Sequence, residues 1–157
     1  MNDPLIVTEI KESTFENVIR KLGNELLEVK SVQDEYINSV LEKEAILPTA
    51  LKINGICIAI PHTDEVNTII ESNVVIGVLN KPVLFGSMVD PHEKLAVSIV
   101  FLLALKDPSL QLLFLKNMIR VLQKKEVISK LILSKTKKDV RDVWNNIISS
   151  DELKILT

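Results

Sequence analysis

The chain has 157 residues, of which 46% are hydrophobic and 25% are charged, and its formal net charge at pH 7 is -2. This length and composition fit one globular domain, residues 1–157, and exclude a largely disordered chain. The slightly negative charge provides no basic field that would attract nucleic acid, so we expect no nucleic-acid partner.

Nothing in the sequence indicates export or membrane insertion. The most apolar run, Leu95–Leu105, is too short for a membrane span and ends in Lys106-Asp107-Pro108. The first residues, Met1–Pro4, lack the basic region and apolar core of a secretory signal, and Cys57 is the single cysteine. We therefore expect a cytoplasmic protein, with Cys57 buried and inert inside an apolar strand.

The N-terminal part is expected to form a short strand at Leu5–Val7 and then two helices. Ser13-Thr14-Phe15-Glu16 resembles a capping box, in which a hydroxyl and a carboxylate satisfy free backbone amides. A second helix is expected from about Gln33 to Glu44, ending before Pro48. The apolar positions facing the core are Phe15, Val18, Ile19, Leu22 and Leu26 in the first helix, and Tyr36, Ile37, Val40 and Leu41 in the second.

The middle of the chain is expected to contribute most of the sheet. Val74–Leu79 and Val83–Phe85 have strand-like composition, and Asn80-Lys81-Pro82 between them predicts a turn. A polar connection, Gly86–Lys94, leads to Leu95–Leu105, whose continuous apolar character predicts a strand buried on both faces.

Helices are expected to complete the chain. Asp107-Pro108 is a strong helix start, and the helix should run to about Gln123. Another helix is expected over Glu126–Leu133, and Thr136-Lys137-Lys138-Asp139 offers a second capping-box-like start for a last one. Their predicted inner stripes are Leu110, Leu113, Phe114, Met118, Val121 and Leu122, and then Val140, Val143, Trp144, Ile147 and Ile148.

The strongest candidate for chemistry is the stretch that ends at His62. Ile56–Ile60 is a β-branched apolar run bounded by Asn54-Gly55 and Pro61, which predicts a short buried strand with His62 just beyond its carboxyl end. Ligands usually bind at that end of strands in α/β proteins, and imidazole is a nucleophile near neutral pH. The alternative is a histidine with a structural role.

The other histidine, His92, is expected in a solvated loop beside acidic residues. Two histidines without a dense set of carboxylates or thiols do not make a metal-ligand pattern, so we predict no metal site.

Several motifs together resemble a known family. They are Tyr36, Leu41-Glu42-Lys43-Glu44, Pro48-Thr49, Ile58-Ala59-Ile60-Pro61-His62 and the strand Ala96–Leu105. In this order they are similar to the fructose/mannitol type of enzyme IIA (EIIA type 2) of the bacterial phosphoenolpyruvate-dependent sugar phosphotransferase system, most closely to its galactitol-type branch. The resemblance runs from the first helix to about Gln123.

This resemblance implies a phosphoryl relay. His62 would accept a phosphoryl group from the phosphocarrier protein HPr and pass it to an enzyme IIB, in support of a membrane subunit IIC, and no cofactor would be required. We predict a single three-layer α/β domain whose mixed β-sheet has helices on both faces, with His62 in a shallow depression accessible to partners.

The same resemblance suggests three supporting residues. Lys43 stands where mannitol-type members have an arginine, so it keeps the charge but loses the planar fork that binds phosphate, and its alternative role is to complement a helix end. Thr49 matches the family's Pro-Thr pair and would support the phosphate or the imidazole, unless it only forms a turn. Ser109 occupies the place of a second histidine, which galactitol-type members also lack.

Two other functions remain open from the sequence. One is a regulatory protein like the nitrogen-related enzyme IIA, in which phosphorylation of His62 changes which partner is bound. The other is a degenerate domain without phosphoryl transfer, for which the substitutions at Lys43 and Ser109 would argue.

Overall fold

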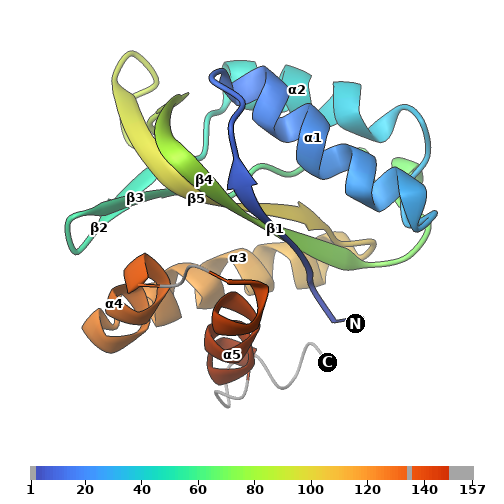
Figure 1. The fold of residues 1–157 in the computed structure, drawn as a ribbon. Helices are drawn as coiled ribbons and strands as arrows, with labels where there is room; N and C mark the ends of the chain where they lie inside the picture. The colour runs from blue at the N-terminus through green and yellow to red at the C-terminus, as the bar shows by residue number, and fades with distance from the viewer. Residues whose placement is uncertain (1–2, 134–135, 149–157) are drawn as a thin grey trace.

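One mixed β-sheet forms the middle layer of the computed structural model, which describes residues 3–133 and 136–148 (Figure 1). Within those residues the sheet has five strands in the order β1-β4-β5-β3-β2. Their bounds are Leu5–Ile10 (β1), Leu51–Ile53 (β2), Ile56–Ala59 (β3), Asn73–Gly86 (β4) and Lys94–Ala104 (β5). β1 is parallel to β4 and β3 is parallel to β5, whereas β4–β5 and β2–β3 are antiparallel.

Helices cover both faces of this sheet (Figure 1). On one face lie α1 (Phe15–Glu28) and α2 (Tyr36–Ile46), and on the other lie α3 (Pro108–Leu122), α4 (Lys125–Leu133) and α5 (Lys137–Ile148). A short 3-10 helix, η1 (Val66–Thr68), follows the segment that carries His62. The predicted three-layer α/β architecture is confirmed.

The sheet separates two apolar cores. Alternate residues of β5 point to opposite faces: Phe101 and Leu103 join the core under α3 and α5, while Val100 and Leu102 join the core under α1 and α2. This alternation confirms the predicted central strand, which is buried on both faces from Ile99 to Ala104, whereas Ala96 near its start is exposed.

The predicted turn at Asn80-Lys81-Pro82 is wrong. β4 continues through these residues as one strand from Asn73 to Gly86. Its register against β5 shifts between Val78 and Val83, so an irregularity in the ladder accommodates the extra residues. Pro82 has no N–H to donate and is tolerated there because the ladder is already interrupted.

The helix starts agree only in part with the predicted capping boxes. The first helix is capped by Thr14, whose Oγ1 accepts from the Asn17 N–H at 3.2 Å, so the box expected from Ser13 and Glu16 is displaced by one residue and lacks the carboxylate. Before α5, Thr136 Oγ1 accepts from the Asp139 N–H at 3.2 Å and Asp139 Oδ2 accepts from the Thr136 N–H at 3.3 Å, which confirms that reciprocal cap.

The predicted inner stripe of α3 also needs one correction. Leu113 is 37% exposed, whereas Phe114, Met118, Val121 and Leu122 are buried. Gln111 takes the inward position one turn before Phe114, at the spacing that a helix requires. The side chains of Leu110, Ile147 and Ile148 lie outside the described part of the chain.

Candidate active site

The β2–β3 hairpin and the parallel pairing of β3 with β5 determine the position of His62. The hairpin turns at Asn54 and Gly55, whose φ angles of 50° and 85° favour these residue types. β3 then pairs with β5 through Ile58 and Ala59. Beyond the end of β3, the Pro61 carbonyl still accepts from the Leu103 N–H at 3.0 Å, so the backbone that leads into His62 remains fixed to the sheet.

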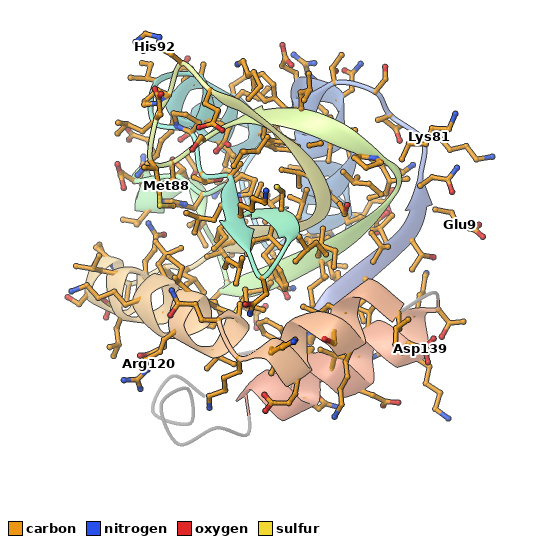
Figure 2. The ribbon with its side chains drawn as sticks, turned by 90° about the vertical axis from the view of Figure 1, so that its left-hand side faces the viewer. Glu9, Lys81, Met88, His92, Arg120 and Asp139 are labelled. Carbon is orange, nitrogen blue, oxygen red and sulfur yellow. The ribbon has the colours of Figure 1, made fainter. Side chains whose placement is uncertain are left out.

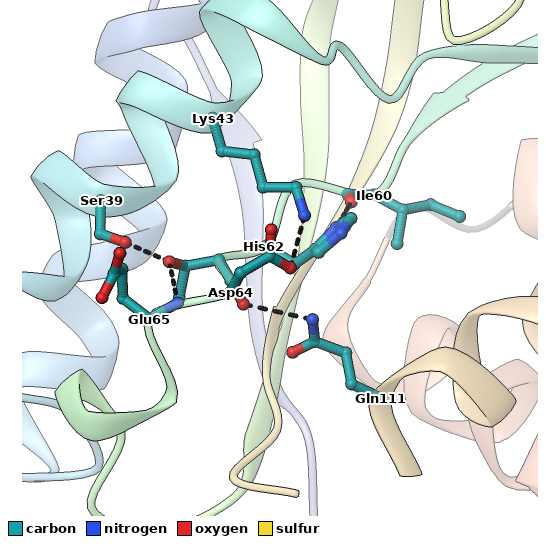
Figure 3. Close-up of polar contacts among 8 residues, drawn as sticks. Ser39, Lys43, Ile60, His62, Asp64, Glu65 and Gln111 are labelled. Atoms are coloured by element: carbon teal, nitrogen blue, oxygen red, sulfur yellow. Dashed lines mark hydrogen bonds and ion pairs between the residues drawn. The ribbon is translucent and has the colours of Figure 1, made fainter. Parts of the chain in front are cut away.

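The imidazole of His62 has one nitrogen engaged with the backbone. Its Nδ1 lies 2.8 Å from the Ile60 carbonyl oxygen (Figure 3). A carbonyl only accepts, so Nδ1 carries the hydrogen and donates, which leaves Nε2 of a neutral ring with a free lone pair. The geometry therefore leaves Nε2 as the ring nitrogen that is available to act as a nucleophile.

The surroundings of His62 favour this neutral form. Burial lowers the pKa of the imidazole below its usual value, the Ile60 hydrogen bond acts in the opposite direction, and the nearby Lys43 cation lowers the pKa further while Asp64 raises it. A neutral imidazole at pH 7 is the form that can attack phosphorus.

Lys43, in the last turn of α2, lies beside this histidine (Figure 3). Its Nζ is 2.7 Å from Asp64 Oδ1, and the Lys43 side chain is 19% exposed while that of Asp64 is 75% exposed. Both residues line a shallow hollow of about 250 Å³. His62 is itself only 8% exposed and borders this hollow rather than lining it, so the predicted depression lies next to the histidine.

Thr49 and Glu44 form a buried pair behind His62. Each is 3% exposed. Glu44 Oε1 accepts from the Thr49 N–H at 3.0 Å, and the Thr49 hydroxyl donates to the same carboxylate at 3.0 to 3.1 Å. The Thr49 hydroxyl in turn accepts from the Ile60 N–H at 3.0 Å. Thr49 therefore holds the backbone of Ile60, two residues before His62, and its hydroxyl hydrogen points to Glu44.

Glu44 is a residue that the sequence reasoning did not select. A signal for it exists, because Glu44 follows Tyr36 and Val40 at four-residue spacing, and all three are buried on one face of α2. A carboxylate on an apolar stripe needs a specific partner, and Thr49 provides it here.

The structure does not bring Ser109 into the site. Ser109 is exposed and its backbone N–H donates to Asp107 Oδ1 at 2.9 Å, at the start of α3. Gln111, which is 6% exposed, approaches instead, and its Nε2 donates to the Thr63 carbonyl at 3.2 Å (Figure 3). Its Oε1 has no hydrogen-bond partner among the described residues. A glutamine on the inner stripe of α3 was the available signal for this residue.

The remaining titratable candidates lie elsewhere. His92 is exposed in the loop between β4 and β5, as predicted (Figure 2). Cys57 is partly rather than fully buried, and this burial raises the pKa of its thiol, which disfavours the reactive thiolate. Among the described residues, no three histidine, cysteine or acidic side chains are grouped to hold a metal ion, and no helix is long and apolar enough to cross a membrane.

Burial of Glu44 should make stability depend on pH. Burial raises its pKa to about 7 from 4.5, although the Thr49 hydrogen bonds and Lys43 oppose the shift. Between about pH 4.5 and 7, Glu44 therefore keeps its proton in the folded protein but loses it in the unfolded chain. The contribution of Glu44 to the free energy of unfolding is fully present below pH 4.5. It declines as the pH rises through about 7, by about 3 kcal/mol in total.

This decline should be measured as the free energy of unfolding of the wild type minus that of Glu44→Gln, between pH 5 and 8. His62 has a lowered pKa and contributes an opposite slope to both proteins, so the difference between them reports mainly on Glu44. A difference that rises with pH would contradict the burial argument.

The resemblance to EIIA implies that His62 accepts a phosphoryl group, and Lys43 should then matter for its phosphorylation. Lys43→Met keeps the aliphatic stem but removes the cation that faces His62, so we expect phosphorylation to slow by on the order of a hundredfold. Lys81→Met is the matched control, because Lys81 is exposed on β4 (Figure 2) and is not one of the charged residues that shift the pKa of His62. Initial rates of phosphoprotein formation check this, and equal rates for both variants would contradict a role for Lys43.

These features define an α/β protein with a buried histidine at a strand end, whose surroundings favour the neutral ring, and a lysine beside it. Residues 1–147 match the family model described as phosphoenolpyruvate-dependent sugar phosphotransferase system, EIIA 2. The chain therefore belongs to this family, which confirms the resemblance drawn from the Pro-Thr and Ile-Pro-His motifs, and it is a phosphotransferase component of a sugar phosphotransferase system.

Individual relatives agree with this assignment. The chain is 28% identical over 115 residues to the galactitol-specific EIIA component of Escherichia coli K12, which covers 73% of this chain and 75% of that one. It is 30% identical over 137 residues to the mannitol-specific EIICBA component of Vibrio cholerae, covering 86% of this chain but 19% of that longer protein.

Solved structures share the fold. The crystal structure of IIA mannitol from Escherichia coli has a TM-score of 0.73 at 22% identity and covers 91% of this chain and 97% of that one. The same enzyme in complex with phosphorylated IIB has a TM-score of 0.74 at 21% identity, with 93% and 97% covered.

Proposed function

We propose that this chain, as a single EIIA domain over residues 1–157, relays phosphoryl groups through Nε2 of His62, from phospho-HPr to an enzyme IIB. One observation carries the proposal above all. The 2.8 Å hydrogen bond from Nδ1 to the Ile60 carbonyl leaves Nε2 as the nitrogen with a free lone pair. Membership of the EIIA family supplies the reaction class.

The transfer needs little besides positioning. The Nε2 lone pair attacks the phosphorus of the donor phosphohistidine, the N–P bond of the donor breaks, and a new N–P bond forms on His62. The ring then carries positive charge at Nδ1–H, which the Ile60 carbonyl stabilises. Lys43 can leave Asp64 to meet the phosphoryl oxygens, which carry the charge in a loose transition state. No cofactor takes part.

The acceptor is expected to be a galactitol-type IIB. This follows from 28% identity to a galactitol-specific EIIA component, and the structure of the mannitol enzyme in complex with phosphorylated IIB is the model for docking. The membrane subunit IIC would be an indirect partner. Exchange with HPr requires a cytoplasmic location.

Incubation with phosphoenolpyruvate, enzyme I and HPr tests this function. The folded wild-type protein should acquire acid-labile phosphate, NMR of the phosphoprotein should place it on Nε2, and adding a galactitol-type IIB should remove it. Absence of labelling would overturn the relay and favour a degenerate domain, and phosphate on Nδ1 would contradict the proposed nucleophile. Labelling without transfer to any IIB would favour the regulatory alternative.

A further inference from the structure

A chain of hydrogen bonds connects a buried carboxylate to the imidazole of His62. We propose that Glu44 is a positioning residue that acts through Thr49 and the Ile60 backbone to hold His62 with its hydrogen on Nδ1. This inference rests on the proposed relay through Nε2.

The first link fixes the direction of the Thr49 hydroxyl. Above its pKa of about 7, and therefore at the pH 8 of the test below, Glu44 is a carboxylate that can only accept, and it accepts from both the backbone N–H and the hydroxyl of Thr49 at 3.0 to 3.1 Å. Both side chains are buried, so water does not compete for these bonds. The hydrogen of the Thr49 hydroxyl is therefore donated to Glu44, and the lone pairs of the hydroxyl oxygen remain free to accept a hydrogen bond.

The second link uses those lone pairs. The Ile60 N–H donates to Thr49 Oγ1 at 3.0 Å. Ile60 is fully buried and lies just beyond the last residue of β3, where the regular ladder has stopped. The hydroxyl of Thr49 therefore takes the place of a strand partner for this amide.

The third link reaches the nucleophile. The carbonyl of Ile60 is the group that accepts from His62 Nδ1 at 2.8 Å (Figure 3). Pro61 fixes its own φ between the two residues, and its carbonyl is tied to Leu103. The connection from Ile60 to His62 is consequently short and stiff, so a shift of Ile60 moves the acceptor relative to the ring.

This arrangement controls which nitrogen can react. While the Ile60 carbonyl is held in place, the tautomer with hydrogen on Nδ1 is favoured and Nε2 stays free. If Ile60 is released, the ring can take the other tautomer, in which the hydrogen sits on Nε2 and blocks attack. Glu44 would thus influence the reaction without touching the phosphoryl group.

The test compares tautomers and rates in the full chain. Nitrogen NMR of ¹⁵N-histidine-labelled protein at pH 8 reports which ring nitrogen of His62 carries the hydrogen. The variants are Glu44→Gln, Thr49→Val and Thr49→Ser, and the control is Ser31→Ala. Ser31 is also a buried hydroxyl, but it accepts from Asn73 and belongs to another part of the fold.

Wild type, Thr49→Ser and Ser31→Ala should show hydrogen on Nδ1 and similar rates of phosphorylation. Thr49→Val and Glu44→Gln should show a mixture of tautomers and rates lower by on the order of tenfold or more. Melting temperatures identify any variant that has not folded. If Glu44→Gln fails to fold, the valine and serine variants of Thr49 decide the case.

Two results would overturn the inference. One is an unchanged tautomer and rate in folded Glu44→Gln or folded Thr49→Val, and the other is an equal loss in Thr49→Ser and Thr49→Val, which would assign the effect to packing. The tautomer is read in the unphosphorylated protein. A wild type that holds hydrogen on Nδ1 but accepts no phosphate would therefore refute the relay and leave the positioning by Glu44 to be judged separately.

Discussion

Replacing His62 by glutamine should abolish phosphoryl acceptance. The amide nitrogen of glutamine has no free lone pair, so the N–P bond cannot form, although the side chain still donates hydrogen bonds. We expect the rate of phosphorylation by phospho-HPr to fall to background, at least about 1000-fold, which corresponds to about 4 kcal/mol of transition-state free energy. Intact-mass measurement of acid-labile phosphate checks this.

The matched control is His92→Gln. His92 is the other histidine of the chain, and it is exposed in the loop between β4 and β5 (Figure 2). This variant should be labelled at the wild-type rate. Persistent labelling of folded His62→Gln, or loss of labelling in His92→Gln alone, would show that the phosphoryl group is carried elsewhere.

The position of His62 could be predicted because its determinants are local. A turn at Asn54-Gly55, a β-branched run and Pro61 specify a strand that stops just before the histidine. The local sequence predicted where His62 lies, and the resemblance to the EIIA family predicted which reaction it would carry out. The central strand β5 and the start of α3 were also predictable, because a continuous apolar run and an Asp-Pro pair depend on neighbouring residues only.

The parts that escaped prediction depend on contacts between distant segments. The polar residues Asn80-Lys81-Pro82 predict a turn, but pairing with β5 keeps them in one strand. Glu44 lies closer to its partner and carries a local signal, its four-residue spacing from Val40, but its burial also depends on the hydrogen bonds from Thr49 five residues later. Whether Ser109 or Gln111 faces the site depends on how α3 is rotated about its axis against the core, and no single motif specifies that rotation.

The largest loss of stability should come from Trp144→Ala. Trp144, in α5, is 1% exposed and packs against two aromatic rings, at centroid distances of 6.4 Å from Phe101 and 6.1 Å from Phe114. It therefore joins α5 to both β5 and α3. Truncation removes these contacts and leaves a cavity that rigid neighbours cannot fill, so we expect a loss of about 3 to 5 kcal/mol in the free energy of unfolding.

Urea denaturation of Trp144→Ala and of Val89→Ala measures this effect. Val89 is 84% exposed in the loop after β4, so its truncation should change stability by less than about 0.5 kcal/mol. The same core supports α3, whose first turn brings Gln111 to the Thr63 carbonyl next to His62. A loss below about 1 kcal/mol for Trp144→Ala would mean that α5 adds little to the fold and that α3 is held against the sheet without it.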